Sequence, residues 1–479
     1  MPADFEIDNL GIPPLAGICS YAEAAQPGLA VDATVDRLKR CNYALRRLHE
    51  IATAHLPSTP EWEIKCALSL HLWLDAEHIG AIRSRVAEMR EPPLHLDAVP
   101  DERLRAAFEE LLRCDGSAEL LAGIYAAARS EILAAIDDHL QLLNPLFDYP
   151  TDRLLRTIAR EQRQMLEWGR EALAAVCADD DARLRAEQFE AHVRSCLASA
   201  GGICGTGERP HAHDVPRARW DGEPFEMDVL PRRDARFADP FNATAKVDEY
   251  YKDDSLPADE RAWALAYKRL REMDVPEWMA PILFKTRGKP WEYYHEMSRQ
   301  LWDEARHAMM GEVSLVSLGI PFYAYPIDWA ASVSLNTEFT PLEAHLILWR
   351  IEQDLMPGAS GKRYEWSVAG LHDDPFFTAL QDYDWADEVL HAQIGRRWLA
   401  SEFERAELQT VTTRLLERWE PRLEAYARRA TGAEWWPELV ARARRNARSR
   451  GTRLARRARV QVERSLVHRR AADPLLSGA

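Results

Sequence analysis

The sequence lacks a long apolar run. None of its stretches approaches the roughly 20 consecutive apolar residues that a membrane-spanning helix requires. Its first residues, MPADFEIDNLGIPPL, carry acids where a secretory signal needs a basic region and an apolar core. All seven cysteines lie at or before Cys204 without regular spacing, which favours reduced thiols over a disulfide framework. Together these absences predict a cytoplasmic protein with no membrane span.

The short motifs of several large enzyme classes are also missing. The sequence has no phosphate-binding loop, no nucleophile elbow and no dinucleotide-binding fingerprint. Stretches that alternate apolar and polar residues, as half-buried strands do, are absent as well. Apolar residues instead recur with a period of about 3.6 over long segments. This pattern predicts an all-α fold with helices near 31–55, 61–90, 117–143, 151–177, 259–286, 290–317, 341–356 and 379–405, and more from 408 onward.

Positive charge is scarce except in one segment. The formal net charge of -16 argues against a generic nucleic-acid-binding protein. Residues 441–470, however, contain twelve Arg and a single acid, Glu463, so this segment carries +11 and the remainder -27. We expect the Arg-rich segment to dock on the acidic remainder of its own chain, or on another subunit in a homo-oligomer. The alternatives are an anionic partner, either lipid or nucleic acid, and a disordered segment.

The helical segments fall into two groups. Residues 198–257 are rich in Gly, Pro, Asp and Arg and separate them as an irregular linker. We therefore predict an N-terminal helical bundle at 30–180 and a C-terminal bundle at 258–407, followed by a helical, Arg-rich segment at 408–479.

The two groups contain similar stretches. WEIKCALSLHLWLDAEH (62–78) aligns without a gap with WEYYHEMSRQLWDEARH (291–307), and seven of the seventeen positions are identical. The alignment places Asp75 and His78 on Glu304 and His307. An internal duplication of a four-helix unit explains this repeat, although one aligned helix can also arise by chance.

Two Glu-x-x-His pairs lie on apolar helix faces in the second group, namely Glu304 with His307 and Glu388 with His391. Burying a carboxylate and an imidazole is costly unless both are satisfied. One such pair is weak evidence, because it also describes a surface pair or a buried histidine satisfied by a carboxylate. Two pairs on the second and fourth helices of a predicted bundle match the pattern of dimetal carboxylate proteins. Residues i and i+3 share a helix face, so the Glu can bridge two cations while the His binds one.

The same pattern requires one inward-facing Glu from each of the other two helices. In the first helix, Glu277 shares its face with apolar residues, whereas Glu272 shares its face with Lys268 and Arg269. Glu272 has the more typical spacing, 32 residues before Glu304, but we favour Glu277 because of its apolar face.

In the third helix, Glu352 lies among apolar residues and is favoured over Glu343, which shares a face with Arg350. Lys362 and Arg363 follow this helix. We predict that they lie in a solvated loop; the alternative is that they bind an anionic group of a substrate.

The first group has a less regular set of polar residues on apolar stripes: His49, Asp75, His78, His139 and Glu161. Its fourth helix has Gln164, not His, three residues after Glu161. We interpret this half as a degenerate repeat that serves as a scaffold. The alternative is a second site with altered ligands, holding a single metal ion.

The segments RLREMDVPEWMA, GKPWEYYHEMSRQLWDEARHAMMGE, IEQDLMPGASGKRYEW and DYDWADEVLHAQIGRRW resemble large bacterial proteins of the ferritin-like superfamily. The resemblance extends over residues 230–405 and, more loosely, over 30–177. It implies two ferritin-like four-helix bundles and a non-haem di-iron centre, or one that contains manganese. The ligands carried over from the superfamily fall on Glu277, Glu304, His307, Glu352, Glu388 and His391. The chain differs from ferritin itself, since it is much longer and has a linker and a basic segment.

The resemblance leaves the reaction open, because the superfamily has many activities. We expect an oxidoreductase with two Fe ions, or Mn/Fe, that activates O2 or peroxide to oxidise a small organic substrate. An external electron donor would be needed, because no flavin or iron–sulfur motif is visible. The alternatives are a ferroxidase or metal-handling protein, and a non-catalytic, metal-stabilised helical scaffold.

Overall fold

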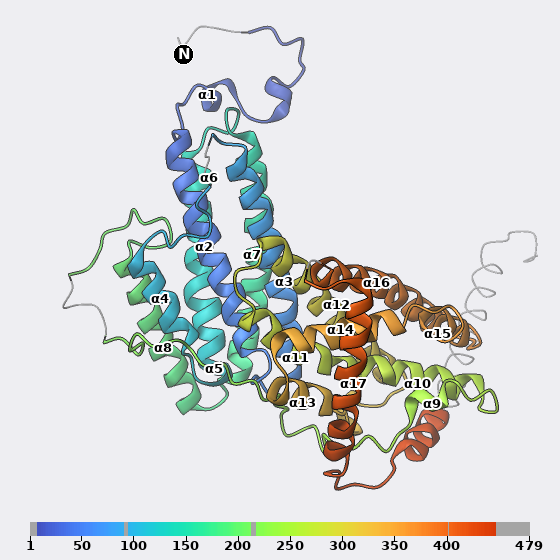
Figure 1. Cartoon of the computed structure of the whole chain (residues 1–479). Helices are drawn as coiled ribbons and strands as arrows, with labels where there is room; N and C mark the ends of the chain where they lie inside the picture. Colours follow the sequence, from blue (N-terminus) through green and yellow to red (C-terminus); the bar gives the residue numbers. More distant parts are fainter. Residues whose placement is uncertain (1–6, 91–93, 212–216, 401, 447–479) are drawn as a thin grey trace, which may run out of the picture. The chain divides into compact units, whose positions relative to one another are not determined.

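The computed structural model describes residues 7–90, 94–211, 217–400 and 402–446 (Figure 1). Within these ranges the regular structure is helical and includes no strand, which confirms the all-α prediction. No helix in this part of the chain combines the length and the apolarity needed to cross a membrane. All seven cysteines are free thiols.

The long predicted helices lie within a few residues of their expected positions: α2 (Val31–His55), α3 (Trp62–Ala87), α7 (Tyr149–Val176), α12 (Trp291–Ser317), α14 (Pro341–Asp354) and α16 (Pro375–Leu399). The segment near 117–143 is interrupted and forms α5 (Gly116–Leu121), the π-helical η2 (Ala122–Arg129) and α6 (Ser130–Leu142). The segment near 259–286 is also interrupted, into α10 (Ala258–Leu270), η4 (Arg271–Met273) and α11 (Asp274–Lys285). This second interruption changes which residues share a helix face.

Several helices are additional to the predicted ones: α4 (Glu102–Leu112), α8 (Asp180–Ser199), α13 (Ala330–Glu338) and α15 (Lys362–Ala369). The sequence does mark the start of α4, because the Asp101 carboxylate caps it by accepting from the backbone N–H groups of Arg103 and Leu104. Since α15 begins at Lys362, the prediction of a solvated loop there is wrong.

The chain forms two compact units, and each is discontinuous in sequence. The first unit comprises Met1–Arg233, Val275–Ala305 and Leu335–His345. The second comprises Asp234–Asp274, Arg306–Ser334 and Leu346–Ala479.

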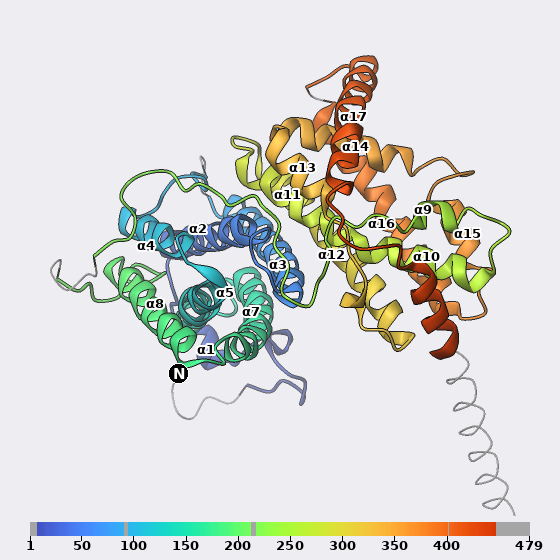
Figure 2. The ribbon, with the colours of Figure 1, turned by 90° about the horizontal axis from the view of Figure 1, so that it is seen from below.

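In the first unit, α2 packs against α3 and α6, and α7 packs against the same two helices. Figures 1 and 2 show α2, α3 and α7 running side by side. Helix α8 packs against α4, α5 and η2. The apolar stripe of α2 explains its central place, since Leu38, Leu45 and Leu48 are fully buried along it.

In the second unit, α10 packs against α9 (Val247–Tyr250) and α15, and α15 packs against α16. Helix α17 (Arg405–Ala427) and a further helical stretch at 436–446 follow. Within this stretch Arg444 forms an ion pair of 2.8 Å with Glu260 on α10, so one arginine of the basic segment does dock on its own chain. Arg442 and Arg445 also belong to the described residues, whereas the arginines from 448 onward lie outside them.

Candidate metal centre

His307 on α12 is completely buried and its two ring nitrogens face different groups. Its Nε2 lies 3.1 Å from Asp387 Oδ2, and an ionised carboxylate can only accept, so Nε2 carries the proton and donates it. In the neutral imidazole, the Nδ1 atom is then a lone-pair donor. It faces Glu272 Oε2 at 3.4 Å, Asp384 Oδ1 at 3.5 Å and Glu388 Oε1 at 3.9 Å. Histidine ligands of metals are commonly held by such a carboxylate on the opposite nitrogen.

His391 on α16 forms a second imidazole-centred group. Its Nδ1 lies 3.4 Å from Glu388 Oε2 and 3.9 Å from Glu352 Oε1. His391, Glu388 and Glu352 are all buried. The ring centroids of His391 and His307 are 5.9 Å apart.

Glu388 belongs to both groups, through different oxygen atoms. Its Oε1 faces His307 and its Oε2 faces His391. A carboxylate that directs one oxygen to each of two imidazoles has the arrangement of a bridging metal ligand.

The described residues contain three groups whose potential ligand atoms all lie within 4.8 Å of one another. These are His307 with Asp384 and Glu388; Glu272 with Glu304 and His307; and Glu304 with Glu352, Glu388 and His391. Glu304 lies one turn before His307 on the unbroken helix α12, so the helix itself places these two side chains on one face.

The distances between these imidazole nitrogens and carboxylate oxygens suit ligand atoms around a metal ion better than hydrogen-bonded pairs. A nitrogen–oxygen hydrogen bond is normally about 2.7–3.2 Å long, shorter than the 3.4–3.9 Å between these imidazoles and carboxylates. Two ligands about 2.1 Å from one ion, at angles of roughly 90–110°, are about 3.0–3.5 Å apart. The group is therefore compatible with metal ions between its members.

Two glycines allow the helices that carry the ligands to approach closely. A Cβ atom on Gly311, one turn after His307, would lie 2.3 Å from the backbone nitrogen of Leu270, two residues before Glu272. A Cβ on Gly395, one turn after His391, would lie 2.6 Å from the Trp349 ring, one turn before Glu352. Both distances exclude a side chain. The absence of a side chain at each glycine thus lets the helix that carries a histidine ligand approach the segment that carries a glutamate ligand.

Two protein cations share the site with the carboxylates. Lys362 Nζ lies 2.8 Å from Glu388 Oε1 and 3.0 Å from both oxygens of Asp384. Arg269 forms an ion pair with Asp384 and lies 3.0 Å from Glu272. Both cations have almost no exposed surface, 1% for Lys362 and 0% for Arg269.

The charges do not balance. The described residues of the second unit include six carboxylates and four cations in this network: Glu272, Glu352, Glu365, Asp384, Asp387 and Glu388 with Lys268, Arg269, Arg306 and Lys362. Glu304 on α12 adds a further carboxylate. An excess of negative charge in a buried site must be neutralised by protons or by bound cations.

The pKa shifts follow from the same contacts. Burial opposes ionisation of Asp384, but the neighbouring Arg269 and Lys362 outweigh it and hold the pKa of Asp384 below its usual value. Burial likewise opposes ionisation of Glu388, and Lys362 and other neighbours outweigh it, so its pKa is well below the usual range. For Glu272, burial dominates and raises the pKa. Asp384 and Glu388 are therefore ionised at neutral pH and available as anionic ligands.

Five of the six predicted ligands occur in these groups: Glu304, His307, Glu352, Glu388 and His391. Glu277 does not. It lies in the first unit, where it is completely buried and forms ion pairs with Lys65 and Arg233. Glu272, the alternative with the 32-residue spacing, is found beside His307 instead. Glu343, the alternative to Glu352, accepts a hydrogen bond of 2.8 Å from the backbone of Thr340 at the start of α14.

Three members of the site, Asp384, Asp387 and Lys362, were not predicted to belong to it. Asp384 could have been found, because it lies four residues before Glu388 and thus on the same face of α16. Asp387 could be inferred only once its position beside His307 is known. Lys362 has no sequence signal, since a lysine after a helix is usually solvated.

The corresponding residues of the first unit are paired differently. Asp75 accepts two hydrogen bonds from Arg129, of 2.7 and 2.8 Å, and His78 Nε2 lies 2.7 Å from Glu161. His49 contacts the Ser298 hydroxyl at 2.7 Å. None of the metal-compatible groups found among the described residues includes His49, Asp75, His78, His139 or Glu161.

The fold and the site together define an all-helical protein with buried carboxylate and imidazole groups that could hold a metal ion. Comparisons of the chain with protein-family models, with curated proteins and with solved structures found no match. The resemblance to ferritin-like proteins therefore stays a prediction.

Proposed function

We propose that the chain is a non-haem oxidoreductase that holds two iron ions, or a Mn/Fe pair, and uses O2 or peroxide to oxidise a small organic substrate. The observation that carries this proposal is the placement of Glu388, whose two oxygens face two different imidazoles. One metal position would be held by His391, Glu352 and Glu388. The other would be held by His307, Glu272, Asp384 and Glu388, and Glu304 would serve both.

The donor set supports this choice of metals. Carboxylate and imidazole ligands suit iron and manganese, whereas a site for copper(I) or structural zinc would favour thiolates. None of the seven cysteines belongs to the metal-compatible groups of the described residues. When bound, the metal pair would supply the redox chemistry that protein side chains lack.

The residues of the chain would prepare the site for that chemistry. Asp387 holds the proton of His307 on Nε2 and so keeps Nδ1 available. Burial of His307, Glu388 and His391 keeps bulk water from the ligands. Lys362 neutralises part of the charge on Asp384 and Glu388, the carboxylates that face His307. We therefore expect the position at His391 to bind metal more tightly, because a cation at His307 must compete with this lysine.

The ferritin-like interpretation of the fold belongs to the same proposal. In the first unit, the packing of α2 and α7 against both α3 and α6 supports a four-helix bundle. We infer that residues 258–407 derive from a repeat of that bundle and that an external protein donates electrons.

The metal content of the purified full-length chain tests the proposal. Protein from cells supplied with iron and manganese should contain about two metal ions per chain by elemental analysis. His391→Gln should lower this to about one or fewer. His345→Gln is a matched control, because His345 is also a buried histidine but lies in none of the metal-compatible groups found in the described residues.

Activity measurements distinguish the alternatives. Oxygen consumption that requires both metal and an added reductant, and that stops after about one turnover without organic substrate, supports the oxidoreductase. Fe(II) oxidation that continues for many equivalents would instead indicate a ferroxidase, and a filled but unreactive site would indicate a scaffold. Circular dichroism confirms folding of each sample. A well-folded wild-type protein with less than about a tenth of a metal ion per chain would rule out the metal site itself.

A further inference from the structure

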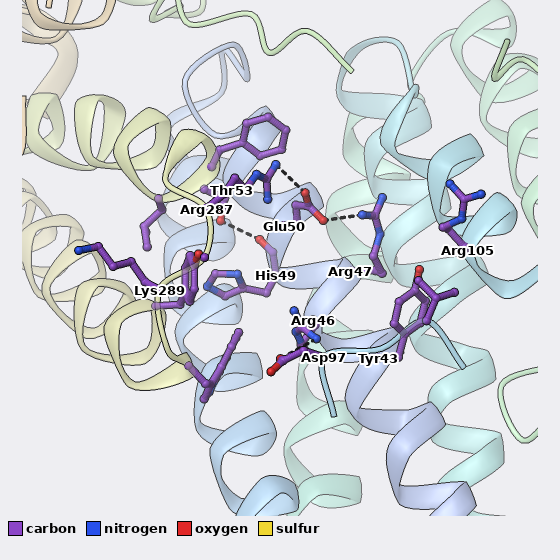
Figure 3. A pocket seen from close by; sticks show the side chains of 16 residues that line it. Tyr43, Arg46, Arg47, His49, Glu50, Thr53, Asp97, Arg105, Arg287 and Lys289 are labelled. Carbon is purple, nitrogen blue, oxygen red and sulfur yellow. Dashed lines mark hydrogen bonds and ion pairs between the residues drawn. The ribbon is translucent and has the colours of Figure 1, made fainter. Parts of the chain in front are cut away.

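The first unit contains a pocket that is not part of the proposed metal centre. It has a volume of about 450 Å³, and its lining comes from α2, the segment before α4, α4 itself, and residues 283–294 (Figure 3). All of these segments belong to the first unit. The volume falls within the range of about 300–1,000 Å³ that is usual for small-molecule sites.

The lining is strongly basic. Five cationic side chains, Arg46, Arg47, Arg105, Arg287 and Lys289, line it together with only two acids, Glu50 and Asp97. Figure 3 shows Arg105 and Lys289 at opposite ends of the pocket, so the positive charge is spread around it. His49, which also lines the pocket, stays neutral at pH 7, because burial lowers its pKa to about 4. The lining therefore has a formal charge of +3 in a protein whose net charge is -16.

The two acids hold the arginines in place. Glu50 uses one oxygen for Arg47, at 2.6 Å, and the other for Arg287, at 2.9 Å. Asp97 lies 3.1 Å from Arg46. These pairs orient the guanidinium groups but leave several of their N–H donors for other acceptors, since each guanidinium has five.

Aromatic side chains form another part of the lining. Trp291 and Tyr294 are stacked, with ring centroids 5.9 Å apart and an angle of 28° between their planes. Phe284 contacts Arg287, whose guanidinium lies 4.8 Å from the ring centroid. Tyr43 also faces the pocket, and burial raises its pKa to about 12, so its hydroxyl remains a neutral donor. The pocket thus combines cations with apolar rings, as a site for an organic anion requires.

We propose that this pocket binds a small organic phosphate, with its phosphate group at Arg46, Arg287 and Lys289 and its organic part against Trp291 and Tyr294. An excess of three positive charges suits a phosphate monoester, which carries close to two negative charges, better than a monocarboxylate. Arginine forks match the oxygens of phosphate. The site needs no glycine-rich phosphate loop, because side chains supply the donors. The volume allows a ligand of about the size of a nucleoside monophosphate.

Calorimetric titration of the full-length chain with phenyl phosphate tests the proposal, with inorganic phosphate and phenylacetate as the other probes. Phenyl phosphate should bind at least about tenfold more tightly than either, because only it offers both the dianion and the ring. Equal binding of phenyl phosphate and phenylacetate would overturn the assignment of phosphate. Equal binding of phenyl phosphate and inorganic phosphate would overturn the role of the aromatic rings, and no binding of any probe would overturn the site.

Variants test where phenyl phosphate binds and whether positive charge in the lining favours its binding. Arg287→Gln with Lys289→Gln should weaken phenyl phosphate binding at least about tenfold. Arg163→Gln is the matched control: Arg163 is similarly exposed and paired, here with Asp137 at 2.6 Å, but does not line the pocket. Glu50→Gln removes a negative charge from the lining and should strengthen binding, about two- to tenfold. Weaker binding by a folded Glu50→Gln protein would contradict the electrostatic argument, as would an Arg163→Gln effect equal to that of the double variant.

Discussion

The repeated stretches 62–78 and 291–307 place an acid and a histidine three residues apart on helices α3 and α12, yet their surroundings differ. In the first stretch, Asp75 accepts from both terminal nitrogens of a single arginine, Arg129, and His78 is paired with Glu161. In the second, His307 faces Glu272, Asp384 and Glu388. The first environment is satisfied by the protein alone. The second has more carboxylates than cations.

The difference shows that the helical pattern alone does not decide whether such a pair can bind a metal. What decides is the charge that other helices bring to it. In the first stretch, one buried arginine, Arg129, neutralises Asp75 by forming an ion pair with it. In the second unit, Arg269 and Lys362 are also present, but the carboxylates outnumber them. Only the residues around the second stretch have an excess of negative charge that a bound metal ion could neutralise.

The largest effect on stability is expected for Arg129→Met. This change leaves Asp75 buried without its paired cation, and breaking a buried ion pair in this way costs about 3–5 kcal/mol. The free energy of unfolding, measured by urea denaturation, should fall by this amount, with no gain in metal content. Adding Asp75→Asn should recover part of the loss, because it removes the uncompensated charge.

An exposed arginine provides the control for that change. Arg163→Met breaks the surface pair with Asp137 and should alter the free energy of unfolding by less than about 1 kcal/mol. If Arg129→Met had an equally small effect, or if it enabled the first unit to bind metal, the contrast between the two stretches would be wrong.

The histidines of the first unit should make it sensitive to acid. Burial lowers the pKa of His49 to about 4, against 6.5 for an unperturbed histidine. Above pH 6.5 His49 is neutral in both the folded and the unfolded chain, so its contribution is fully present. As the pH falls from 6.5 to 4, the unfolded chain takes up the proton more readily and stability is lost, by at most about 3 kcal/mol. Burial lowers the pKa of His139 and His345 to about 4 as well, which adds to the effect.

Urea denaturation at a series of pH values measures this loss. His49→Gln should flatten the dependence between pH 6.5 and 4, whereas His95→Gln, at an exposed position, should leave it unchanged. An unchanged slope in the folded His49→Gln variant would show that His49 accepts a proton in the folded state.

The helices could be predicted because long segments with a helical period bury one continuous face, as α2 and α7 do. The short helices α13 and α15 were not predicted, because they have fewer than three turns and no clear apolar stripe. The interruption of the 259–286 segment by η4 was not predictable from periodicity either, since it changes the helical phase where Glu272 lies.

Glu277 was predicted instead of Glu272 for a separate reason. The face of Lys268, Arg269 and Glu272 was expected to be solvated, as a charged helix face usually is. In the structure Arg269 is buried and pairs with Asp384, so the charged face points into the protein. Buried charges are decided by partners far away in the sequence, which neither residue type nor spacing can identify. The pairs Glu304/His307 and Glu388/His391 were accessible because each lies within one helical turn.

The smallest expected effect is on metal affinity, and it distinguishes the metal position at His307 from the one at His391. Asp387→Asn keeps the size of the side chain but removes the charge that holds the proton of His307 on Nε2. Carboxylates in this role typically contribute 10- to 100-fold, or about 1.4–2.8 kcal/mol, to metal affinity. Titration of metal-depleted protein with Mn2+, followed by calorimetry, should therefore show weaker binding at one of two sites and unchanged binding at the other, which is held by His391.

Glu161→Gln is the matching change in the first unit, because it removes the carboxylate that pairs with His78. We expect it to leave both Mn2+ affinities unaltered. A single binding event, weakened by Asp387→Asn, would mean that the two imidazoles act on one shared metal ion. In that case Glu388 would chelate a single ion with both oxygens instead of bridging two. The second stretch would then differ from the first by contributing to a site for one metal ion, not two.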